Sequence, residues 1–340
     1  MNPKVSIIVP CYNEEKFMPG LLENIVSQDY PDELMEVMII DGGSSDHTRE
    51  IVREFASKNP VIRLLENEKR FVPFALNLGI RKSEGEVIIR MDAHAGYPVN
   101  YVSLLVKRLF ELNADNAGGV WETVPGNDTN KALAISKVLS SPFGIGNALY
   151  RLKVKNARLV DTVPFGCYRR EVFEKIGYFD EELLRNQDDE FNARLKNNGG
   201  KIFLLPEVKI TYYARSSLKS LNKMFFQYGF FKPLVNRKLG KPATVRQFIP
   251  PLFVIFLFAF LVAGFFNALL FYTWLTGITL YVITDLFFTV KIVIGSGKLL
   301  LFFYLPWIFF LVHISYGWGY LAGAWKFLIG NKKYQPVSTR

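Results

Sequence analysis

Cysteine is nearly missing from this chain of 340 residues, which contains only Cys11 and Cys167. Two cysteines cannot form the disulfide framework of a small secreted domain, so we interpret each as a small buried side chain and not as a reactive thiol. The apolar run near the start covers only residues 5–9, which is too short for the apolar core of a signal peptide. We therefore expect that the protein is not secreted in soluble form.

Acidic residues are scarce in the second part of the chain. From Lys201 onward there are 16 Lys and Arg residues but only two acids, Glu207 and Asp285, whereas the residues before it include 25 basic and 29 acidic ones. Hydrophobic residues make up 50% of the chain and charged residues 21%, which excludes a disordered or fibrous protein. A mildly acidic part followed by a basic, apolar one suggests two regions, and it indicates a membrane surface rather than nucleic acid as the partner.

Three long apolar segments lie in the basic part, at residues 249–272, 275–294 and 299–325. The first and third carry no charge, and the second carries only Asp285 and Lys291. Each is long enough for a transmembrane helix, which needs about 20 apolar residues. A chain of this size cannot bury three such helices on all sides, so the sequence predicts membrane insertion of about three hydrophobic segments over residues 248–330.

A basic segment precedes the first apolar one. Between Arg215 and Arg246 there are eight Lys and Arg residues and no acid. Positive residues stay on the cytoplasmic side and attract anionic lipid, so we expect a multi-pass protein of the cell (inner) membrane with its N-terminal domain in the cytoplasm. Within this segment, residues 217–231 suit a helix in the membrane interface, and a helix docked on the soluble domain is the alternative. Three spans would leave the basic residues after 331 outside, so the last segment either spans or re-enters.

The first 210 residues alternate between strand and helix patterns. Apolar strands are predicted at 5–9, 37–40, 61–65 and 86–91, and helices at 14–28 and from Asp46 or His47, with Asp46 as the cap. This order predicts a parallel sheet that binds its ligand at the carboxyl ends of the strands. Polar residues gather at these ends, namely Asn13, Glu14, Asp41, Asp92 and His94.

Each of these polar positions has more than one interpretation. Asp41 is either a turn residue or a carboxylate that accepts the N–H of a nucleotide base. Asp92 and His94 either form a turn or bind Mg²⁺ or Mn²⁺ together with phosphate oxygens, and His94 as a general acid–base is a third option. Asp188 and Asp189 either stabilise the start of a helix at 187–195 or supply a general base, and since they point about 100° apart they cannot share one task.

In combination these motifs resemble the membrane-attached, inverting glycosyltransferases of family 2. The matching segments, in the family's order over residues 4–205, are VSIIVPCYNEE, IIDGGSSDHT, IIRMDAHA, VPFGCYRREVFEKIGYFDEEL and QDDEFNARL. The DAHA variant and residues 313–325 are most similar to the branch of succinoglycan-type glucosyltransferases. The resemblance implies an α/β fold, a GT-A (Rossmann-like nucleotide-sugar) domain with a C-terminal transmembrane helical region. Its boundaries would be 1–212 for the catalytic domain, 213–247 for basic interfacial helices, 248–330 for the transmembrane region and 331–340 for a basic tail.

The resemblance also implies a role for each matching residue. Asp188 would be the catalytic base, and Asp92 and His94 would hold Mg²⁺ or Mn²⁺. The nucleotide-sugar would be bound by Pro10, Tyr12, Glu14, Asp41 and Asp92, and the acceptor side would be formed by Phe165, Gly166, Gln187, Asp189 and Glu190. Three of these positions depart from the family's pattern, because Gln187 replaces Glu and both Glu190 and His94 replace Asp.

The implied reaction is transfer of one sugar from a UDP-sugar to a lipid-linked (polyprenyl-diphosphate) saccharide at the cytoplasmic membrane face, for exopolysaccharide or surface glycan. The Q-x-x-R-W motif of processive synthases is missing, and three apolar segments are too few for a polymer channel. Gln227 and Lys232 occupy the comparable stretch and are candidates for a diphosphate contact, with a membrane-surface role as the alternative. Two other interpretations stay open, transfer directly to polyprenyl phosphate and a catalytically silent scaffold with the same fold.

Overall fold

Four parallel strands form one part of a mixed sheet in this computed structural model, which describes residues 2–330. The strands are β1 (Val5–Cys11), β2 (Met35–Asp41), β3 (Ile62–Glu66) and β4 (Val87–Arg90), in the spatial order β3-β2-β1-β4. All four are parallel, and the strands predicted from apolar runs are confirmed. β1 extends past Pro10, where we expected it to end. β4 pairs with β1 only as far as Ile8, so the N–H that Pro10 lacks does not interrupt that pairing.

Five further strands complete the sheet in antiparallel pairings that the strand–helix pattern does not predict. They are β5 (Ala95–Gly96), β6 (Asn116–Val124), β7 (Arg158–Leu159), β8 (Cys167–Arg169) and β9 (Ile202–Tyr213). The sheet order continues from β4 as β8-β6-β9-β5, and β7 pairs with β9. The predicted fold class, a GT-A-type α/β domain, is confirmed by this mixed sheet.

Helices flank the sheet and close its core. They are α1 (Met18–Val26), α2 (Thr48–Lys58), α3 (Val72–Lys82), α4 (Tyr101–Glu111), α7 (Arg170–Ile176) and α8 (Gln187–Asn197). α1 begins four residues later than predicted, because Glu14 C=O first accepts the N–H groups of Phe17 and Met18 in a turn. α2 begins at Thr48, whose N–H donates to the Asp46 carboxylate (3.1 Å) as expected, although the residue at the cap position is His47.

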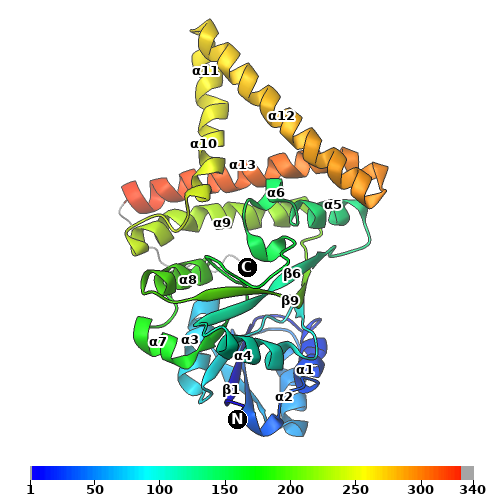
Figure 1. The fold of residues 1–340 in the computed structure, drawn as a ribbon, viewed down its shortest axis with the longest axis vertical. Coiled ribbons are helices and arrows are strands. Elements are labelled where there is room, and N and C mark those ends of the chain that lie inside the picture. The colour runs from blue at the N-terminus through cyan, green and yellow to red at the C-terminus, as the bar shows by residue number, and fades with distance from the viewer. Residues whose placement is uncertain (1, 331–340) are drawn as a thin grey trace. The chain divides into compact units, whose positions relative to one another are not determined.

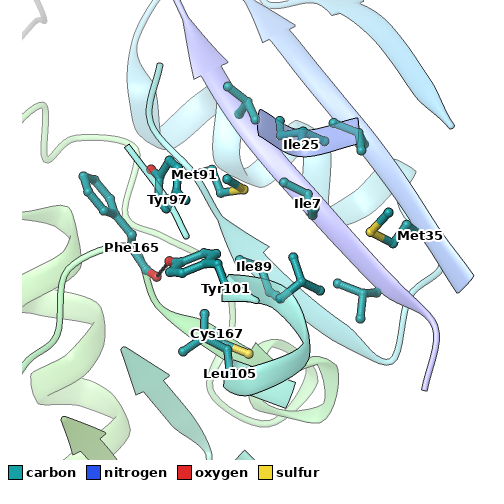
Figure 2. Packing of buried hydrophobic residues seen from close by; sticks show 14 of the residues in the cluster. Ile7, Ile25, Met35, Ile89, Met91, Tyr97, Tyr101, Leu105, Phe165 and Cys167 are labelled. Atoms are coloured by element: carbon teal, nitrogen blue, oxygen red, sulfur yellow. Dashed lines mark hydrogen bonds between the residues drawn. The ribbon is translucent and has the colours of Figure 1, made fainter. Parts of the chain in front are cut away.

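The core lies between β1, β4 and α4, where Ile7, Ile89 and Leu105 are fully buried (Figure 2). Both cysteines are buried and free, and burial raises the pKa of each thiol well above its usual range, which confirms that they are structural.

The chain divides into two compact units. Of the described residues, the first contains 2–122 together with Lys153–Tyr212, and the second contains Thr123–Leu152 together with 213–330. The basic tail predicted at 331–340 lies outside the described residues.

The second unit is helical. Its helices are α5 (Asn130–Val138), α6 (Pro142–Ile145), α9 (Leu218–Leu239), α10 (Ile249–Ile255), α11 (Leu261–Gly264), α12 (Ala268–Ser296) and α13 (Leu305–Ala324). Within the part of the chain that the structure describes, three stretches are long and apolar enough to cross a membrane, Val245–Gly264, Ala268–Ser296 and Leu299–Ile329. The predicted boundary between the first two is wrong, because the chain turns before Asn267, which caps α12 by accepting the N–H of Leu269 (2.9 Å).

Candidate active site

The loops that follow β1 and β4 meet at the carboxyl edge of the parallel strands. His94 Nδ1 lies 3.5 Å from Glu14 Oε1, and the two side chains are 33% and 16% exposed. Glu14 is held in place because its N–H donates to Thr48 Oγ1 (2.9 Å) at the start of α2. The structure thus brings these two predicted residues together beside solvent.

The Asp41 carboxylate at the end of β2 is fully buried and organises its own loop. It accepts hydrogen bonds from Gly43 N–H (2.9 Å), Ser44 N–H (3.0 Å) and Arg49 Nε (2.6 Å). Burial alone would raise the pKa of Asp41, but the hydrogen bonds from Ser44 and Arg49 outweigh it, so the pKa is lowered. Asp41 therefore has the turn role that the sequence allowed, and its contact with a nucleotide base stays a prediction.

Asp92 is bound by an arginine from the end of β4. Arg90 Nε and Nη2 donate to the two carboxylate oxygens of Asp92 at 2.9 and 3.0 Å, and the side chains are 13% and 17% exposed. The backbone N–H of Asp92 donates to the Tyr97 hydroxyl (2.7 Å), which fixes the loop after the strand. The bidentate pair leaves Asp92 well ordered and still in reach of solvent.

Arg90 also links Asp92 to the predicted base. Burial by itself would lower the pKa of the Arg90 guanidinium, but the negative charges of Asp92 and Asp188 raise it overall. The Arg90 guanidinium lies 5.6 Å from the centre of the Phe165 ring, which covers it on one side. Burial and the charge of Asp188 both raise the pKa of Tyr168. Asp92, which Arg90 binds directly, and Asp188, which is distant in sequence, therefore both act electrostatically on the Arg90 guanidinium.

Phe165 and Gly166 have a backbone that few residues tolerate. Phe165 is buried and has φ +47°, in the left-handed region that non-glycine residues rarely occupy. Its carbonyl accepts a hydrogen bond from Tyr101 Oη (3.2 Å) (Figure 2). The Gly166 carbonyl accepts a hydrogen bond from the Arg90 N–H (3.1 Å). A Cβ at Gly166 would lie 2.5 Å from the Tyr168 ring, so only glycine fits there. Such strain is typical of functional sites, and here it places the Phe165 ring against Arg90.

Helix α8 presents Asp188 from its first turn. The helix follows Asn186, which has φ 60°, and Asp189 N–H donates to Asp188 Oδ1 (3.0 Å). The middle of α8 is anchored to the sheet by buried Asn192, which accepts from Asn116 Nδ2 and donates to Thr162 Oγ1, both at 2.8 Å. This anchor fixes the position of the helix, and a negative charge at its N-terminal end, where Asp188 lies, is favoured by the helix dipole.

Glu190 forms a structural ion pair with Arg194. Its carboxylate is 5% exposed and accepts from Arg194 Nε (2.8 Å) and Nη2 (2.9 Å), and Arg194 also donates to the Tyr178 carbonyl (2.8 Å). Glu190 therefore holds the segment after α7 against α8. Gln187 is buried at the helix start, and the acceptor-side roles of Gln187, Asp189 and Glu190 stay predictions.

For the other predicted residues the structure gives the position in the fold, and their roles stay predictions. Pro10 is in β1, and Tyr12 follows it with a partly buried ring. Gln227 and Lys232 are on α9 in the second unit, so their contact with a diphosphate stays a prediction.

The donor atoms present suit a divalent ion whose remaining coordination positions are filled by the substrate. Within residues 2–330, no group of three or more His, Cys, Asp or Glu side chains could hold a metal ion. Magnesium at nucleotide sites takes only one or two carboxylates and fills its other positions with phosphate oxygens and water, and Mn²⁺ accepts imidazole. Asp92 and His94, with Glu14 beside the imidazole, match that donor set, although Asp92 would share its charge with Arg90.

Two arginines of this site were missed by the analysis of the sequence. Arg49 pairs with Asp41, and Arg90 pairs with Asp92. Arg90 carried a signal, because a charged side chain that ends an otherwise apolar strand requires a partner when it is buried. Arg49 carried none, since an arginine on an exposed helical turn is ordinary.

Comparisons with known proteins agree with this geometry. The amino-acid sequence matches the model of glycosyl transferase family 2 over residues 6–177. The chain is 29% identical over 337 residues to the dolichyl N-acetyl-alpha-D-glucosaminyl phosphate 3-beta-D-2,3-diacetamido-2,3-dideoxy-beta-D-glucuronosyltransferase of Methanococcus voltae, covering 97% of this chain and 99% of that protein. It is 30% identical over 246 residues to the succinoglycan biosynthesis protein ExoA of Rhizobium meliloti (strain 1021), covering 72% and 73% of the two chains.

Among solved structures, the chain is similar to the mannosyltransferase PcManGT from Pyrobaculum calidifontis in complex with GDP-Man and Mn²⁺. The TM-score is 0.58 at 20% sequence identity, and the match covers 98% of this chain and 89% of that one. At this identity the similarity establishes the shared fold.

Proposed function

The chain belongs to glycosyltransferase family 2, and we propose that it is an inverting enzyme that moves one sugar from a UDP-sugar to a saccharide carried by a polyprenyl lipid. The observation that supports this proposal is the Arg90 guanidinium, which pairs with the Asp92 carboxylate and whose pKa is also raised by the negative charge of Asp188. Asp188 at the start of a helix can then serve the acceptor, and Asp92 at the end of a strand can serve the donor.

The proposed chemistry assigns the proton to Asp188. Its carboxylate accepts the proton of the acceptor hydroxyl as that oxygen attacks the anomeric carbon of the donor. The bond from the anomeric carbon to the diphosphate breaks on the opposite side, so the configuration inverts and the nucleoside diphosphate leaves. A divalent ion held by Asp92 and His94 would offset the charge of that diphosphate. Arg90 keeps Asp92 oriented, and the α8 anchor at Asn192 keeps Asp188 at a fixed position.

The acceptor class is supported by one of the relatives. The name of the Methanococcus voltae protein, which matches nearly the whole chain, gives a sugar on dolichyl phosphate as its acceptor. We extend this class to the present protein and place the reaction at the cytoplasmic face of the membrane, where the basic segment between Arg215 and Arg246 would meet anionic lipid. Transfer to the bare polyprenyl phosphate is the competing acceptor, and polyprenyl diphosphate saccharides are the expected substrates for exopolysaccharide or surface glycan.

The donor and the acceptor can be tested in one assay on the full chain in proteoliposomes. Labelled UDP-glucose, UDP-galactose, UDP-N-acetylglucosamine, UDP-glucuronate and GDP-mannose are each supplied with a polyprenyl-linked saccharide or with bare polyprenyl phosphate. We expect labelled lipid from one UDP-sugar, only with the linked saccharide, and loss of the product in EDTA. Labelled product from the bare carrier would replace the proposed acceptor, and product from GDP-mannose alone would contradict the proposed donor.

A further inference from the structure

Helices α9 and α13 form a parallel pair in constant register. Ser315 Oγ donates a hydrogen bond to Asn222 Oδ1. One turn further along both helices, a Cβ at Gly319 would overlap the backbone oxygen of Phe226, and after another turn a Cβ at Gly323 would overlap the backbone oxygen of Phe230. Steps of four residues on α13 therefore match steps of four on α9 in the same direction. Small residues at this spacing let two helix backbones approach closely.

The pair continues to the ends of both helices. Arg237 Nη1, near the end of α9, donates to the backbone oxygen of Phe327 (2.7 Å), and Asn236 Nδ2 donates to Tyr320 Oη (3.2 Å). The two helices are parallel and matched from the pair Asn222 and Ser315 to the pair Arg237 and Phe327, so this part of the last apolar stretch cannot cross a bilayer without α9 beside it.

The charges of α9 oppose such a crossing. The helix carries Lys219, Lys223, Lys232, Arg237 and Lys238, spread from its first turn to its last, and it is not among the three stretches apolar enough to span. A Lys or Arg at the centre of a membrane helix costs about 2.5 to 3.5 kcal/mol on the insertion scale. The segment from Arg215 to Arg246 contains no acidic residue, so its net charge is positive. The apolar composition of α13 allows a span, but the helix bound to it does not.

The other apolar helices, α10 to α12, form a hairpin that extends away from the α9–α13 pair. α10 begins against α13, because a Cβ at Gly317 would lie 2.5 Å from the Pro250 carbonyl, and α12 returns to α13 where Tyr281 Oη lies 2.9 Å from His313 Nδ1. The tip of the hairpin is exposed, with Phe265 81% and Phe266 86% accessible. Figure 1 shows α10–α11 and α12 rising from α13, whereas α13 and α9 run side by side across the base of the hairpin.

We infer that only the α10–α12 hairpin spans the bilayer, and that the α9–α13 pair lies in the lipid–water interface on the side of the first unit. The lysines of α9 then meet anionic headgroups, and the exposed rings of Trp307, Trp318 and Trp325 on α13 and just after it occupy the interface, where tryptophan is favoured. Ile329, at the end of the last apolar stretch, then lies on the side from which the chain entered, in contrast to the arrangement with a third span. This inference does not depend on the proposed donor or acceptor.

Thiol labelling of the full chain in intact cells tests the topology. Lys58→Cys marks the first unit, Phe266→Cys marks the hairpin tip, and Lys298→Cys and Gly330→Cys mark the two ends of the last apolar stretch. All four positions are exposed, whereas Cys11 and Cys167 are buried and provide an unreactive background. We expect a membrane-impermeant maleimide to label Phe266→Cys in intact cells. Gly330→Cys should be labelled only after the cells are permeabilised, as Lys58→Cys and Lys298→Cys are. Labelling of Gly330→Cys together with Phe266→Cys would establish a third span and overturn the inference.

A second measurement tests the helix pair itself. The double variant Asn222→Cys/Ser315→Cys is expected to cross-link in membranes with a short thiol-specific reagent, because the two native side chains are hydrogen-bonded. The control Asn222→Cys/Ser296→Cys places the second thiol at the end of α12 and is expected not to cross-link. Failure of the first pair in a chain that is otherwise labelled normally would show that α9 and α13 are not paired in the membrane, and would remove the argument against a third span.

Discussion

Replacement of Arg90 tests the electrostatic organisation of the site. Two of its nitrogens bind both oxygens of Asp92 at 2.9 and 3.0 Å, with the two side chains only 13% and 17% exposed. Breaking a fully buried ion pair costs about 3 to 5 kcal/mol, and since solvent still reaches this pair we expect Arg90→Met to lower the free energy of unfolding by about 2 to 3 kcal/mol. For a domain of this size, that corresponds to a melting temperature lower by about 4 to 12 °C in detergent.

The same replacement has a separate kinetic consequence. The acid limb is the low-pH side of the profile of kcat/KM against pH, where activity falls as the base is protonated. If Asp188 is the base, removal of the positive charge of Arg90 disfavours its ionised form, so the acid limb moves to higher pH. A shift of one pH unit corresponds to about 1.4 kcal/mol and to a tenfold lower rate below the limb, and we expect a shift of about that size. Arg90→Lys is the matched control, because it retains the charge but cannot make the bidentate pair, so it should lose stability while its acid limb stays near that of the parent.

The reasoning about Arg90 would be refuted by an Arg90→Met variant whose acid limb and melting temperature both equal those of the parent enzyme. An acid limb that shifts equally in Arg90→Met and Arg90→Lys would show that hydrogen-bond geometry, and not charge, controls the base.

Three further predictions concern other residues of the site. Asp41→Asn should lower the free energy of unfolding of the domain by about 2 kcal/mol at pH 7. Folding lowers the pKa of Asp41, so the ionised carboxylate stabilises the parent above the unfolded pKa, and this stabilisation is lost as pH falls through the folded pKa. The melting curves of parent and variant should therefore converge below about pH 4. Glu190→Gln should break the pair with Arg194 and lower the melting temperature without moving the acid limb, and a shifted limb would instead place Glu190 beside the reacting groups. His94→Ala should raise the Mn²⁺ concentration for half-maximal activity by at least about tenfold, and an unchanged metal titration would exclude His94 as a ligand.

Local patterns were sufficient to predict the parallel half of the fold. The apolar runs at β1, β2 and β4 and the polar residues behind them follow from strand burial and from the chemistry of strand ends, and these features involve neighbours in sequence. The antiparallel strands are short or pair over long separations, as β8 does with β4, and no repeating pattern within one segment reports such a partner. The same limit explains why residues Thr123–Leu152 could not be assigned to the second unit from the sequence.

The site shows the same division between local and distant information. The sequence left Asp41 open between a turn and a nucleotide contact, and the observed bonds to Gly43 and Ser44 are local ones that its motif implied. The link from Asp92 through Arg90 to Asp188 could not be predicted, because it joins a strand end to a helix almost one hundred residues later. The matched register of α9 and α13 was inaccessible for the same reason, since each helix by itself carries an unrelated pattern.

The most direct test of the account is sugar transfer by Asp188→Asn, measured in a single turnover with the full chain, the preferred nucleotide-sugar and the lipid-linked acceptor. Asp32→Asn serves as the control, because it removes one charge at an exposed position in the turn before β2. The account predicts that Asp188→Asn binds the nucleotide with nearly the affinity of the parent but transfers sugar at least about a thousandfold more slowly, whereas Asp32→Asn is unaffected. Transfer by Asp188→Asn at the rate of the control would contradict the assignment of the base and, with it, the proposed mechanism.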